Sequence, residues 1–353
     1  MVRRIYKKDS SGKIRYLEIR NEGGCVVQES GVVGTDNPVV NVSTCEAKNI
    51  GKSNATTPEE QALLESIAKI TEKMRLGYFD TIEEAQQKGG KDFLLPMLAK
   101  DFKKEKDKIK FPCFVQPKLD GMRALGSAEN LISRTGKVID TLSHIDLSDL
   151  EDVILDGELY AHGISFQENM KLIKKYRPGA TEQVKYHVYD IVMDAPFSLR
   201  TAILLNTVLE IYSEKIEVVP SYKVFDFGDI DRLHQQFIAS GYEGTIIRHS
   251  DEGYQVNKRS SQLLKYKDFL DEVYEIVDVV TSESRPEQGV IVCLCKKTNQ
   301  TFNTGMKFSH EQRENILKNK GEYIGEMAEI RFFEYTDGGL PRFPVCVGVR
   351  LDK

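Results

Sequence analysis

The first ninety residues alternate between polar and apolar positions in short runs. The stretch KIRYLEIRNEGGCVVQESGVVGTDNPVVNVSTCEA is interrupted by Gly-Gly, by single glycines and by Asp-Asn-Pro. Alternation between such turn residues is typical of short antiparallel strands. The sequence Thr57-Pro58-Glu59-Glu60 then predicts a helix start, because a capping threonine is followed by proline and acidic residues. Apolar residues continue this helix at helical spacing: Leu63, Leu64, Ile67, Ile70 and Met74. A second short helix is expected at TIEEAQQK.

The segment 91–268 mixes strand and helix patterns. Short β-rich runs predict strands at CFVQPKL, ALGSA, NLISR, DVILDGELY, VKYHVYDIV, EGTIIRH and QLLKYK. Longer runs with helical spacing predict helices at SFQENMKLIKKY, LRTAILLNTVLEIYSE and DIDRLHQQFIASG. This segment is therefore expected to be a domain that mixes strands and helices.

The texture changes again from about residue 269. Strands are predicted at DEVYEIVDVV, GVIVCLCKK and TFNTGM, then a helix capped by Ser309, then strands at EMAEIRFFEY and PVCVGVRL. Three strands, a helix and two strands are the element order of an OB-fold β-barrel. We therefore expect an α+β multidomain protein with domains at 1–90, 91–268 and 269–353.

Composition adds limits to this picture. The net charge is −5 and no apolar run approaches the roughly 20 residues of a membrane span. The basic N-terminus has no apolar segment of a secretory signal. Six scattered cysteines, without a CxxC pair, are expected to be small buried hydrophobes. A reduced, intracellular protein (cytoplasm, nucleoid or nucleus, or a host cell for a viral source) is expected, with no membrane partner.

Charged residues recur where the predicted strands of the middle segment end. They occur in KLDGMR, SRTGK, LDGELY, YHVYDIV, YEGTIIR and LLKYK. One charge at a strand end is usually only solvated, but six such ends in one segment indicate a shared polar site. Lysine and arginine suit phosphate, carboxylates suit Mg²⁺, and an aromatic ring suits a purine.

Spacing within these motifs sharpens the prediction. Side chains two apart in a strand share a face, so Lys118 and Asp120 point the same way, as do Lys265 and Lys267. Gly121 lets the chain turn close to a phosphate, and Arg123 can reach a second phosphate with its forked guanidinium.

Other nucleotide-binding and metal-binding motifs are not supported. Gly51-Lys52-Ser53 resembles the end of a P-loop, but the first glycine of that motif is replaced by Glu46. No GxGxxG follows a predicted strand, and no HExxH or CxxC pattern indicates zinc.

The ordered motifs, with PMLAK before them and PRFPVCVGVRLDK at the end, resemble those of the ATP-dependent DNA ligases. These enzymes belong to the covalent nucleotidyltransferase superfamily, together with RNA ligases and capping enzymes. The resemblance covers about 97–353. It implies an ATP-grasp-like nucleotidyltransferase domain, an OB-fold domain, ATP and Mg²⁺ as cofactors, and nicked duplex DNA as the partner.

The resemblance also implies roles for individual residues. Lys118 resembles the nucleophile that takes AMP from ATP, and Glu158 and Tyr189 resemble the residues that hold the ribose and stack on adenine. Glu243, with Glu158, resembles the metal-binding carboxylates. The remaining matches imply an adenine pocket at Gln116, α-phosphate contacts at Lys265 and Lys267, AMP or nick-phosphate contacts at Arg123 and Arg134, and pyrophosphate contacts at Arg350, Asp352 and Lys353.

A lysine nucleophile makes a demand of its own. With an ordinary pKa of about 10.4, deprotonating Lys118 at pH 7 costs about 4.6 kcal/mol, at ~1.36 kcal/mol per pKa unit. Neighbouring cations such as Lys265 and Lys267, and a metal ion at Glu243, would lower that cost. An ionised Asp120 beside Lys118 would raise it, so Asp120 is expected to act on metal, water or DNA ends instead.

The first ninety residues loosely resemble a WGR domain. The resemblance lies in the strand-rich start, a Gly-x-x-Gly turn at Gly31 and Gly34, and a closing helix that ends at Gly77. The chain has no tryptophan, and Ser30 and Val32 stand where the domain's Trp and Arg would be. Because basic and acidic residues are equal in number here, the segment is either a plain folding module or a third DNA contact. The candidate DNA-binding residues are Lys7, Lys8, Lys13 and Arg15.

Of three functions considered, the resemblance of KLDGMR, EGTIIR and the terminal RFPVCVGVRLDK favours the first, which acts through a covalent lysyl-AMP and a DNA-adenylate. The first is a monomeric DNA ligase that seals 5′-phosphate/3′-hydroxyl nicks in replication, repair or recombination. The second is a sister enzyme, either an RNA ligase or a GTP-dependent capping enzyme. The third is a non-catalytic nick-binding protein on the same scaffold.

Overall fold

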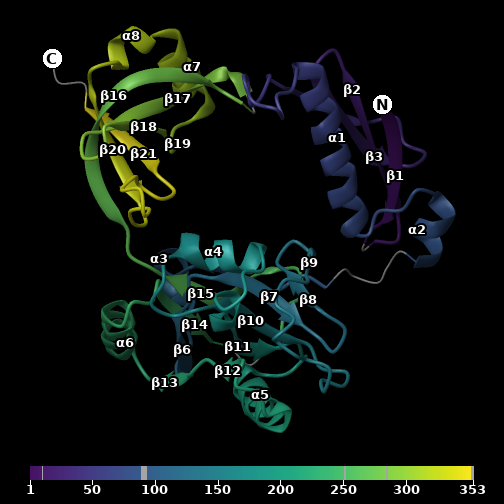
Figure 1. Cartoon of the computed structure of the whole chain (residues 1–353), viewed down its shortest axis with the longest axis vertical. Coiled ribbons are helices and arrows are strands. Elements are labelled where there is room, and N and C mark those ends of the chain that lie inside the picture. Colours follow the sequence, from purple (N-terminus) through teal and green to yellow (C-terminus); the bar gives the residue numbers. More distant parts are fainter. Residues whose placement is uncertain (10, 89–93, 250–251, 284, 351–353) are drawn as a thin grey trace. The chain divides into compact units, whose positions relative to one another are not determined.

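The computed structural model describes residues 1–9, 11–88, 94–249, 252–283 and 285–350 (Figure 1). Its compact units are Leu94–Phe269, and Met1–Phe93 taken with Leu270–Lys353. Within the second unit, residues 1–88 and 270–350 have separate sheets and separate cores. The division into three domains stays a prediction.

The N-terminal stretch forms a four-stranded antiparallel sheet in the order β1-β2-β3-β4. Its strands are β1 (Val2–Lys8), β2 (Ile14–Glu22), β3 (Cys25–Val32) and β4 (Val39–Thr44). The predicted antiparallel strands are confirmed, and β1 is added to them. The sequence of β1 gave no strand signal, because only Ile5 is buried in a run rich in charged residues.

Helix α1 (Pro58–Arg75) begins where the sequence predicts. Thr57 Oγ1 accepts from the Glu60 amide at 3.2 Å, and the Glu60 carboxylate accepts from the Thr57 amide at 2.8 Å. This reciprocal capping satisfies two backbone donors of the first turn. The buried face is made by Ala62, Ser66 and Ile70, whereas the predicted apolar residues Leu63, Leu64 and Ile67 are exposed. Helix α2 (Ile82–Lys88) follows as expected.

The predicted Gly-x-x-Gly turn is corrected by the structure. Gly31 lies inside β3 opposite Tyr16, so only Gly34, with φ +86°, lies in the turn. A Cβ at position 31 would lie 2.9 Å from the Tyr16 ring. Glycine is therefore needed at 31 for close packing rather than for a turn.

The middle unit contains two sheets. The six-stranded sheet has the order β12-β11-β10-β7-β8-β9, and the five-stranded sheet has the order β13-β6-β14-β15-β5. The first comprises β7 (Met122–Gly126), β8 (Leu131–Ser133), β9 (Val138–Ile139), β10 (Leu155–Tyr160), β11 (Lys185–Ile191) and β12 (Ile216–Val218). The second comprises β5 (Leu98–Asp101), β6 (Cys113–Lys118), β13 (Tyr222–Val224), β14 (Gly244–Arg248) and β15 (Arg259–Tyr266). All seven predicted strands occur; β5, β9, β12 and β13 were missed because two to four residues give too short a pattern.

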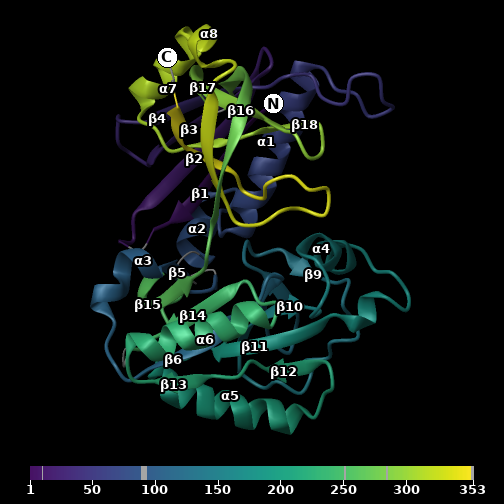
Figure 2. The same cartoon turned by 90° about the vertical axis from the view of Figure 1, so that its left-hand side faces the viewer.

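Helices cover these two sheets. Helix α5 (Phe197–Ile211) packs against β11 and β12, and α6 (Phe227–Ala239) packs against β6 and β14 (Figure 2). Helix α4 (Phe166–Lys174) packs against β7, and the short α3 (Phe102–Glu105) packs against β15. The three helices predicted from spacing are thus confirmed as α4, α5 and α6.

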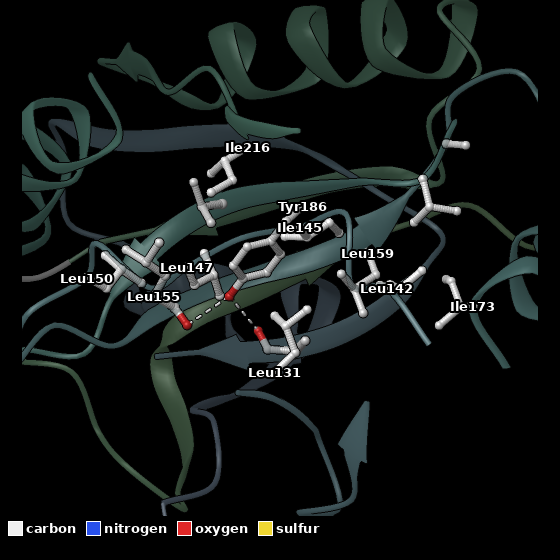
Figure 3. Packing of buried hydrophobic residues seen from close by; sticks show 14 of the residues in the cluster. Leu131, Leu142, Ile145, Leu147, Leu150, Leu155, Leu159, Ile173, Tyr186 and Ile216 are labelled. Atoms are coloured by element: carbon white, nitrogen blue, oxygen red, sulfur yellow. Dashed lines mark hydrogen bonds between the residues drawn. The ribbon is translucent and has the colours of Figure 1, made fainter. Parts of the chain in front are cut away.

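The core of the six-stranded sheet is organised around Tyr186 (Figure 3). This ring is fully buried, and its hydroxyl donates to the backbone carbonyls of Ala124 (3.0 Å) and Leu155 (2.9 Å). A buried tyrosine needs such a partner, because an unpaired hydroxyl in an apolar core is costly. Tyr186 therefore ties together β7, β10 and β11, three of the strands that carry the predicted site.

The C-terminal stretch forms a six-stranded sheet in the order β18-β17-β16-β20-β21-β19. Its elements are β16 (Leu270–Ser282), β17 (Arg285–Cys295), β18 (Gln300–Asn303), β19 (Gly305–Met306), α7 (His310–Lys318), α8 (Lys320–Tyr323), β20 (Met327–Phe332) and β21 (Val345–Arg350). The two edge strands β18 and β19 are separated along the chain only by Thr304. The sheet must therefore curl until its edges meet, which gives the expected barrel.

The cysteines behave as small hydrophobes, as expected. All six are free thiols; five are buried and Cys25 is half-buried. Cys293 and Cys295 lie on the same face of β17 and contribute to the barrel core.

Candidate active site

A cavity of about 260 Å³ is lined by residues from both sheets of the middle unit. Nine of the residues chosen from the sequence line it: Gln116, Lys118, Arg123, Arg134, Glu158, Tyr189, Glu243, Lys265 and Lys267. They come from strands far apart in the sequence, so the fold itself assembles the site.

Strand pairing sets the position of Lys118. In the antiparallel ladder of β6 and β14, Lys118 lies opposite Gly244, and the Glu243 amide donates to the Lys118 carbonyl at 2.9 Å. Gly244 has φ +155°, and a Cβ there would lie 2.3 Å from the Tyr266 carbonyl oxygen. Glycine at this position lets β14 approach β15, which carries Lys265 and is followed directly by Lys267.

Glu243 binds two of the cavity lysines. Lys118 Nζ donates to Oε2 of Glu243, and Lys267 Nζ donates to Oε1 at 3.0 Å. Burial acts to raise the pKa of Glu243, but the positive charges of Lys118 and Lys267 outweigh burial. The pKa of Glu243 is therefore lowered from its ordinary value. Glu243 is therefore ionised at neutral pH, and it is the ion-pair partner of Lys118.

Lys265, on β15, is the third lysine that lines the cavity, beside Lys118 and Lys267. Within the part of the chain that the structure describes, no carboxylate lies within ion-pair distance of its ammonium group. Burial lowers the pKa of Lys265, and the positive charges of Lys267 and Lys118 lower it further. A partly desolvated cation that lines a cavity and has no ion pair among the described residues is suited to an anionic ligand such as phosphate.

Glu158 and Tyr189 lie next to each other on the other sheet. The Tyr189 hydroxyl is 3.3 Å from Oε2 of Glu158. Burial raises the pKa of Glu158 to about 7, although Lys118 and Arg123 act to lower it. Glu158 and Glu243 are the two carboxylates that could hold Mg²⁺. Among the described residues there is no group of three or more metal-binding side chains. Two carboxylates fit Mg²⁺ bound together with substrate phosphate, which is the common arrangement for that ion.

Arg123 is held by Asp156, a fully buried aspartate. Its Nε and Nη2 donate to the two carboxylate oxygens at 2.9 and 2.5 Å, and the Tyr254 hydroxyl donates to the same carboxylate at 2.7 Å. The turn before Arg123 requires Gly121, because a Cβ there would lie 2.3 Å from the Leu159 carbonyl oxygen. The buried Asp156 carboxylate thus fixes the orientation of the Arg123 guanidinium, and Arg123 lines the cavity.

Asp120 does not face this cavity. It is half-buried and does not line the cavity within the described residues, and its negative charge contributes to the raised pKa of Tyr160, which burial mainly causes. The expected role of Asp120 on metal, water or DNA ends stays a prediction.

Comparison with known proteins identifies the family of this chain. Residues 96–267 match the model of the ATP dependent DNA ligase domain, and residues 287–350 match the DNA ligase OB-like domain. The chain belongs to the ATP-dependent DNA ligase family. The WGR likeness of the first ninety residues has no support from these comparisons and stays a prediction.

Individual relatives agree with the family models. A DNA ligase of African swine fever virus (isolate Pig/Kenya/KEN-50/1950) is 29% identical over 296 residues, covering 72% of this chain and 64% of that protein. A DNA ligase of Haemophilus influenzae is 28% identical over 228 residues, covering 64% of this chain and 82% of that protein. The chain thus spans less than two thirds of the length of the viral relative.

Solved structures share the fold. One from a study of Lig E DNA ligases has a TM-score of 0.64 at 22% identity and covers 72% of this chain and 99% of that chain. Another, designated Pmar-Lig_Pre., has a TM-score of 0.65 at 21% identity and covers 81% of this chain and 71% of that one. These likenesses support the nucleotidyltransferase and OB-fold architecture.

A second cavity of about 550 Å³ adjoins the first in this ligase-family domain. The two share Arg123, Arg134 and Glu158. Arg134 is exposed and has no ion pair within the described residues. Lys137 and Lys174 add positive charge to the second cavity.

Other residues expected to act on nucleotide or DNA lie elsewhere in the fold. Arg350, at the end of β21, pairs with Glu329 (2.9 Å) in the barrel and does not line either cavity, while Asp352 and Lys353 lie outside the described residues. Lys7 donates to the Leu76 carbonyl at the end of α1 (2.7 Å), and Arg15 pairs with Asp9 (2.9 Å). Lys8 and Lys13 have no ion-pair partner among the described residues of the N-terminal sheet.

Sequence reasoning missed the role of Arg248, which also lines the cavity. Arg248 binds Gln116 and the buried Asp190. Arg248 and Asp190 were visible as charges in strand motifs, but their pairing joins residues far apart in sequence. Arg259 lines the cavity as well, at the start of β15 but outside the predicted strand QLLKYK, so no sequence pattern indicated it.

No helix in the described part of the chain has both the length and the apolar character needed to cross a membrane.

Proposed function

We propose that this chain is an ATP-dependent DNA ligase that seals nicks between a 5′-phosphate and a 3′-hydroxyl in duplex DNA. The observation that carries the proposal is the convergence of Lys118, Lys265 and Lys267 with Glu243 in one partly buried cavity. A phosphate-binding lysine cluster with one lysine positioned as a nucleophile fits nucleotidyl transfer.

In the first step the neutral amine of Lys118 attacks the α-phosphorus of ATP. A phosphorus–nitrogen bond forms, the bond to the bridging oxygen breaks, and pyrophosphate leaves with that electron pair. Lys265 and Lys267 stabilise the negative charge that develops on the phosphate oxygens. Because Lys118 Nζ donates to Glu243 in the structure, this ion pair must open before the amine can reach the phosphorus. Mg²⁺ held by Glu243 and Glu158 would neutralise further charge on the phosphates.

In the second and third steps the AMP passes to the DNA and is then displaced. The 5′-phosphate of the nick attacks the lysyl-AMP phosphorus and releases Lys118. The 3′-hydroxyl then attacks the DNA-adenylate, forms the phosphodiester and releases AMP. The second cavity is suited to the incoming strand end, because Arg123, Arg134 and Lys137 line it and present positive charge to a phosphate.

The N-terminal sheet is proposed to supply a further DNA contact through Lys8 and Lys13, the candidates whose charges are not neutralised in the structure. Replacing both with glutamate should weaken nick binding and lower the slope of log affinity against log salt by about 1 per lost phosphate contact. Self-labelling with ATP should stay unchanged. Unchanged nick affinity would rule out this contact.

The proposed activity is tested by incubation of the full chain with α-³²P-labelled ATP and Mg²⁺, followed by denaturing electrophoresis. We expect covalent label on the protein, its transfer to nicked DNA, and loss of both in Lys118→Ala. Chelation of divalent ions should also prevent labelling. Label on Lys118→Ala protein, or labelled protein that seals nicked RNA and not nicked DNA, would contradict the proposal.

The enzyme is further proposed to work as a monomer inside a cell, in replication, repair or recombination. Size-exclusion chromatography with light scattering tests the first point, because a dimer would elute at twice the mass of 40.1 kDa.

A further inference from the structure

Gln116 is a buried amide next to the nucleophile. It lies two residues before Lys118 on β6, so both side chains share one face of the strand, roughly 7 Å apart along it. Its side chain is 1% exposed, and the residue lines the cavity. An amide in this place can select a ligand by hydrogen bonding, provided that its orientation is fixed.

Three hydrogen bonds fix that orientation. Oε1 of Gln116 accepts from Arg248 Nε at 2.7 Å, while Nε2 donates to the Tyr189 carbonyl at 3.1 Å and to Ser221 Oγ at 2.9 Å. Arginine can only donate and a carbonyl can only accept, so the amide oxygen must face Arg248. A flipped amide would place its NH₂ group against the arginine N–H and its oxygen against a carbonyl oxygen.

Arg248 is itself held in place by a buried carboxylate. Its Nη1 donates to Oδ2 of Asp190 at 2.5 Å, and Asp190 is fully buried. Arg200 donates to both oxygens of the same carboxylate at 2.7 and 3.1 Å, and to the Ala195 carbonyl at 2.5 Å. The Arg248 guanidinium also lies 4.8 Å from the Phe197 ring centroid. Arg248 therefore has little freedom to turn away from Gln116.

The fixed amide has limited capacity left. Both N–H groups of Gln116 are used by the protein, and only the second lone pair of Oε1 remains. A nucleobase that meets this oxygen must offer a hydrogen-bond donor. Adenine has an amino group at position 6, whereas guanine has a carbonyl oxygen there, which would leave two acceptors facing each other.

We propose that Arg248, anchored by Asp190, is a positioning residue that makes Gln116 an obligatory acceptor and so selects a 6-amino purine. The proposal rests on the proposed function, because it concerns the nucleotide that Lys118 attacks. It assigns nucleobase choice to a buried network that does not itself react.

The test is self-labelling of the full chain with four nucleoside triphosphates. Wild-type protein should accept ATP and 2,6-diaminopurine triphosphate, which carry the 6-amino group, and should reject GTP and ITP, which do not. A site built around a buried hydrogen bond rejects the mismatched ligand by a large factor, so we expect an ATP-to-GTP ratio of at least about 10³.

Arg248→Met should lower that ratio at least tenfold, because the freed amide can present its NH₂ group to guanine. Gln116→Glu should keep the preference for ATP, because a carboxylate still accepts from Arg248 and can still accept from adenine. Arg232→Met is the matched control. Arg232 is an exposed arginine on α6 of the same unit, and its removal should leave the ratio unchanged.

Ser221→Ala covers the case in which Arg248→Met fails to fold. It frees one N–H of Gln116 and leaves the buried ion pairs intact, so a smaller fall in the ratio, about threefold, is expected. A folded Arg248→Met protein, or a Ser221→Ala protein, that keeps the wild-type ratio would overturn the inference and leave the proposed function standing. Absence of label on wild-type protein with every nucleotide would overturn both.

Discussion

Two regions of this molecule carry dense networks of arginine and carboxylate, and they differ in burial. Around the cavity, the pairs Arg123–Asp156 and Arg248–Asp190 have side chains that are 0 to 16% exposed. On the N-terminal sheet, Arg4–Glu18 and Arg20–Glu22 have side chains that are 16 to 62% exposed. The same chemical groups therefore have different energetic consequences in the two regions.

The exposed network stabilises the fold only slightly, because solvent screens each pair and both side chains lose freedom. The buried network costs desolvation energy that its mutual attraction repays only with good geometry. A fold under pressure for stability alone would replace such pairs with apolar residues. Under the proposed function, these buried pairs direct Arg123 and Gln116 toward the bound nucleotide.

The largest loss of stability is expected when the aspartate of a buried ion pair is removed. Asp156→Ala leaves the Arg123 charge without its partner and the Tyr254 hydroxyl without its acceptor. The free energy of unfolding should fall by about 3–5 kcal/mol, measured by urea denaturation. A loss below about 1 kcal/mol would show that burial does not distinguish the two networks.

A smaller loss is expected at the turn that joins β6 to β7. Gly121→Ala places a Cβ about 2.3 Å from the Leu159 carbonyl, so the backbone must shift and move Lys118 relative to Arg123. Self-labelling with ATP should fall at least about tenfold, which corresponds to ~1.4 kcal/mol. Gly321→Ala, where a Cβ meets nothing within 4 Å, is the control and should label normally.

A pH-dependent effect on stability of roughly 3 kcal/mol is expected at Glu158, because its pKa changes from 4.5 to about 7 and each pKa unit corresponds to ~1.36 kcal/mol. Burial raises its pKa from 4.5 to about 7, so the folded state binds a proton that the unfolded state releases. This contribution to stability is complete below pH 4.5 and is lost as the pH rises through 7. Glu158→Gln should therefore gain stability relative to wild type between pH 4.5 and 7, as measured by urea denaturation at several pH values. Parallel pH profiles would contradict the shifted pKa.

The smallest effect is expected in the exposed network. Glu18→Ala removes a partner from Arg4 and Arg20, yet the free energy of unfolding should fall by less than about 1 kcal/mol. The loss should shrink further at high salt, because the pairs are screened. A loss as large as that of Asp156→Ala would remove the distinction between the two regions.

The hydrophobic pattern predicted most of the fold because period-2 and period-3.6 signals are local. Strands β6, β10 and β14 were identified from a few consecutive residues each. Strand β1 was not predicted because its exposed positions are mostly charged. Strands β12 and β13 were not predicted because three residues are too few to show a period-2 pattern. The exposure of Leu63 and Leu64 on α1 could not be predicted, since spacing gives a helix but not which face meets the sheet.

The candidate site could be predicted only in part, for the same reason. Motif residues such as Lys118 and Glu243 stand out where strands end. The contacts that orient them join positions far apart in sequence: Gln116 and Arg248 are 132 residues apart, and Asp156 and Tyr254 are 98 apart. No local spacing contains that information.

The ladder between β6 and β14 has a consequence for how the chain can change in length. Lys118 lies opposite Gly244 and next in space to Glu243, so one inserted or deleted residue in either strand would turn the lysine and the carboxylate to opposite faces of the sheet. A single substitution can be compensated by a change at a neighbouring residue, but a shift in strand register cannot. Insertions and deletions in this unit should therefore be confined to connections such as the one between α5 and β12, and they should be absent from these two strands.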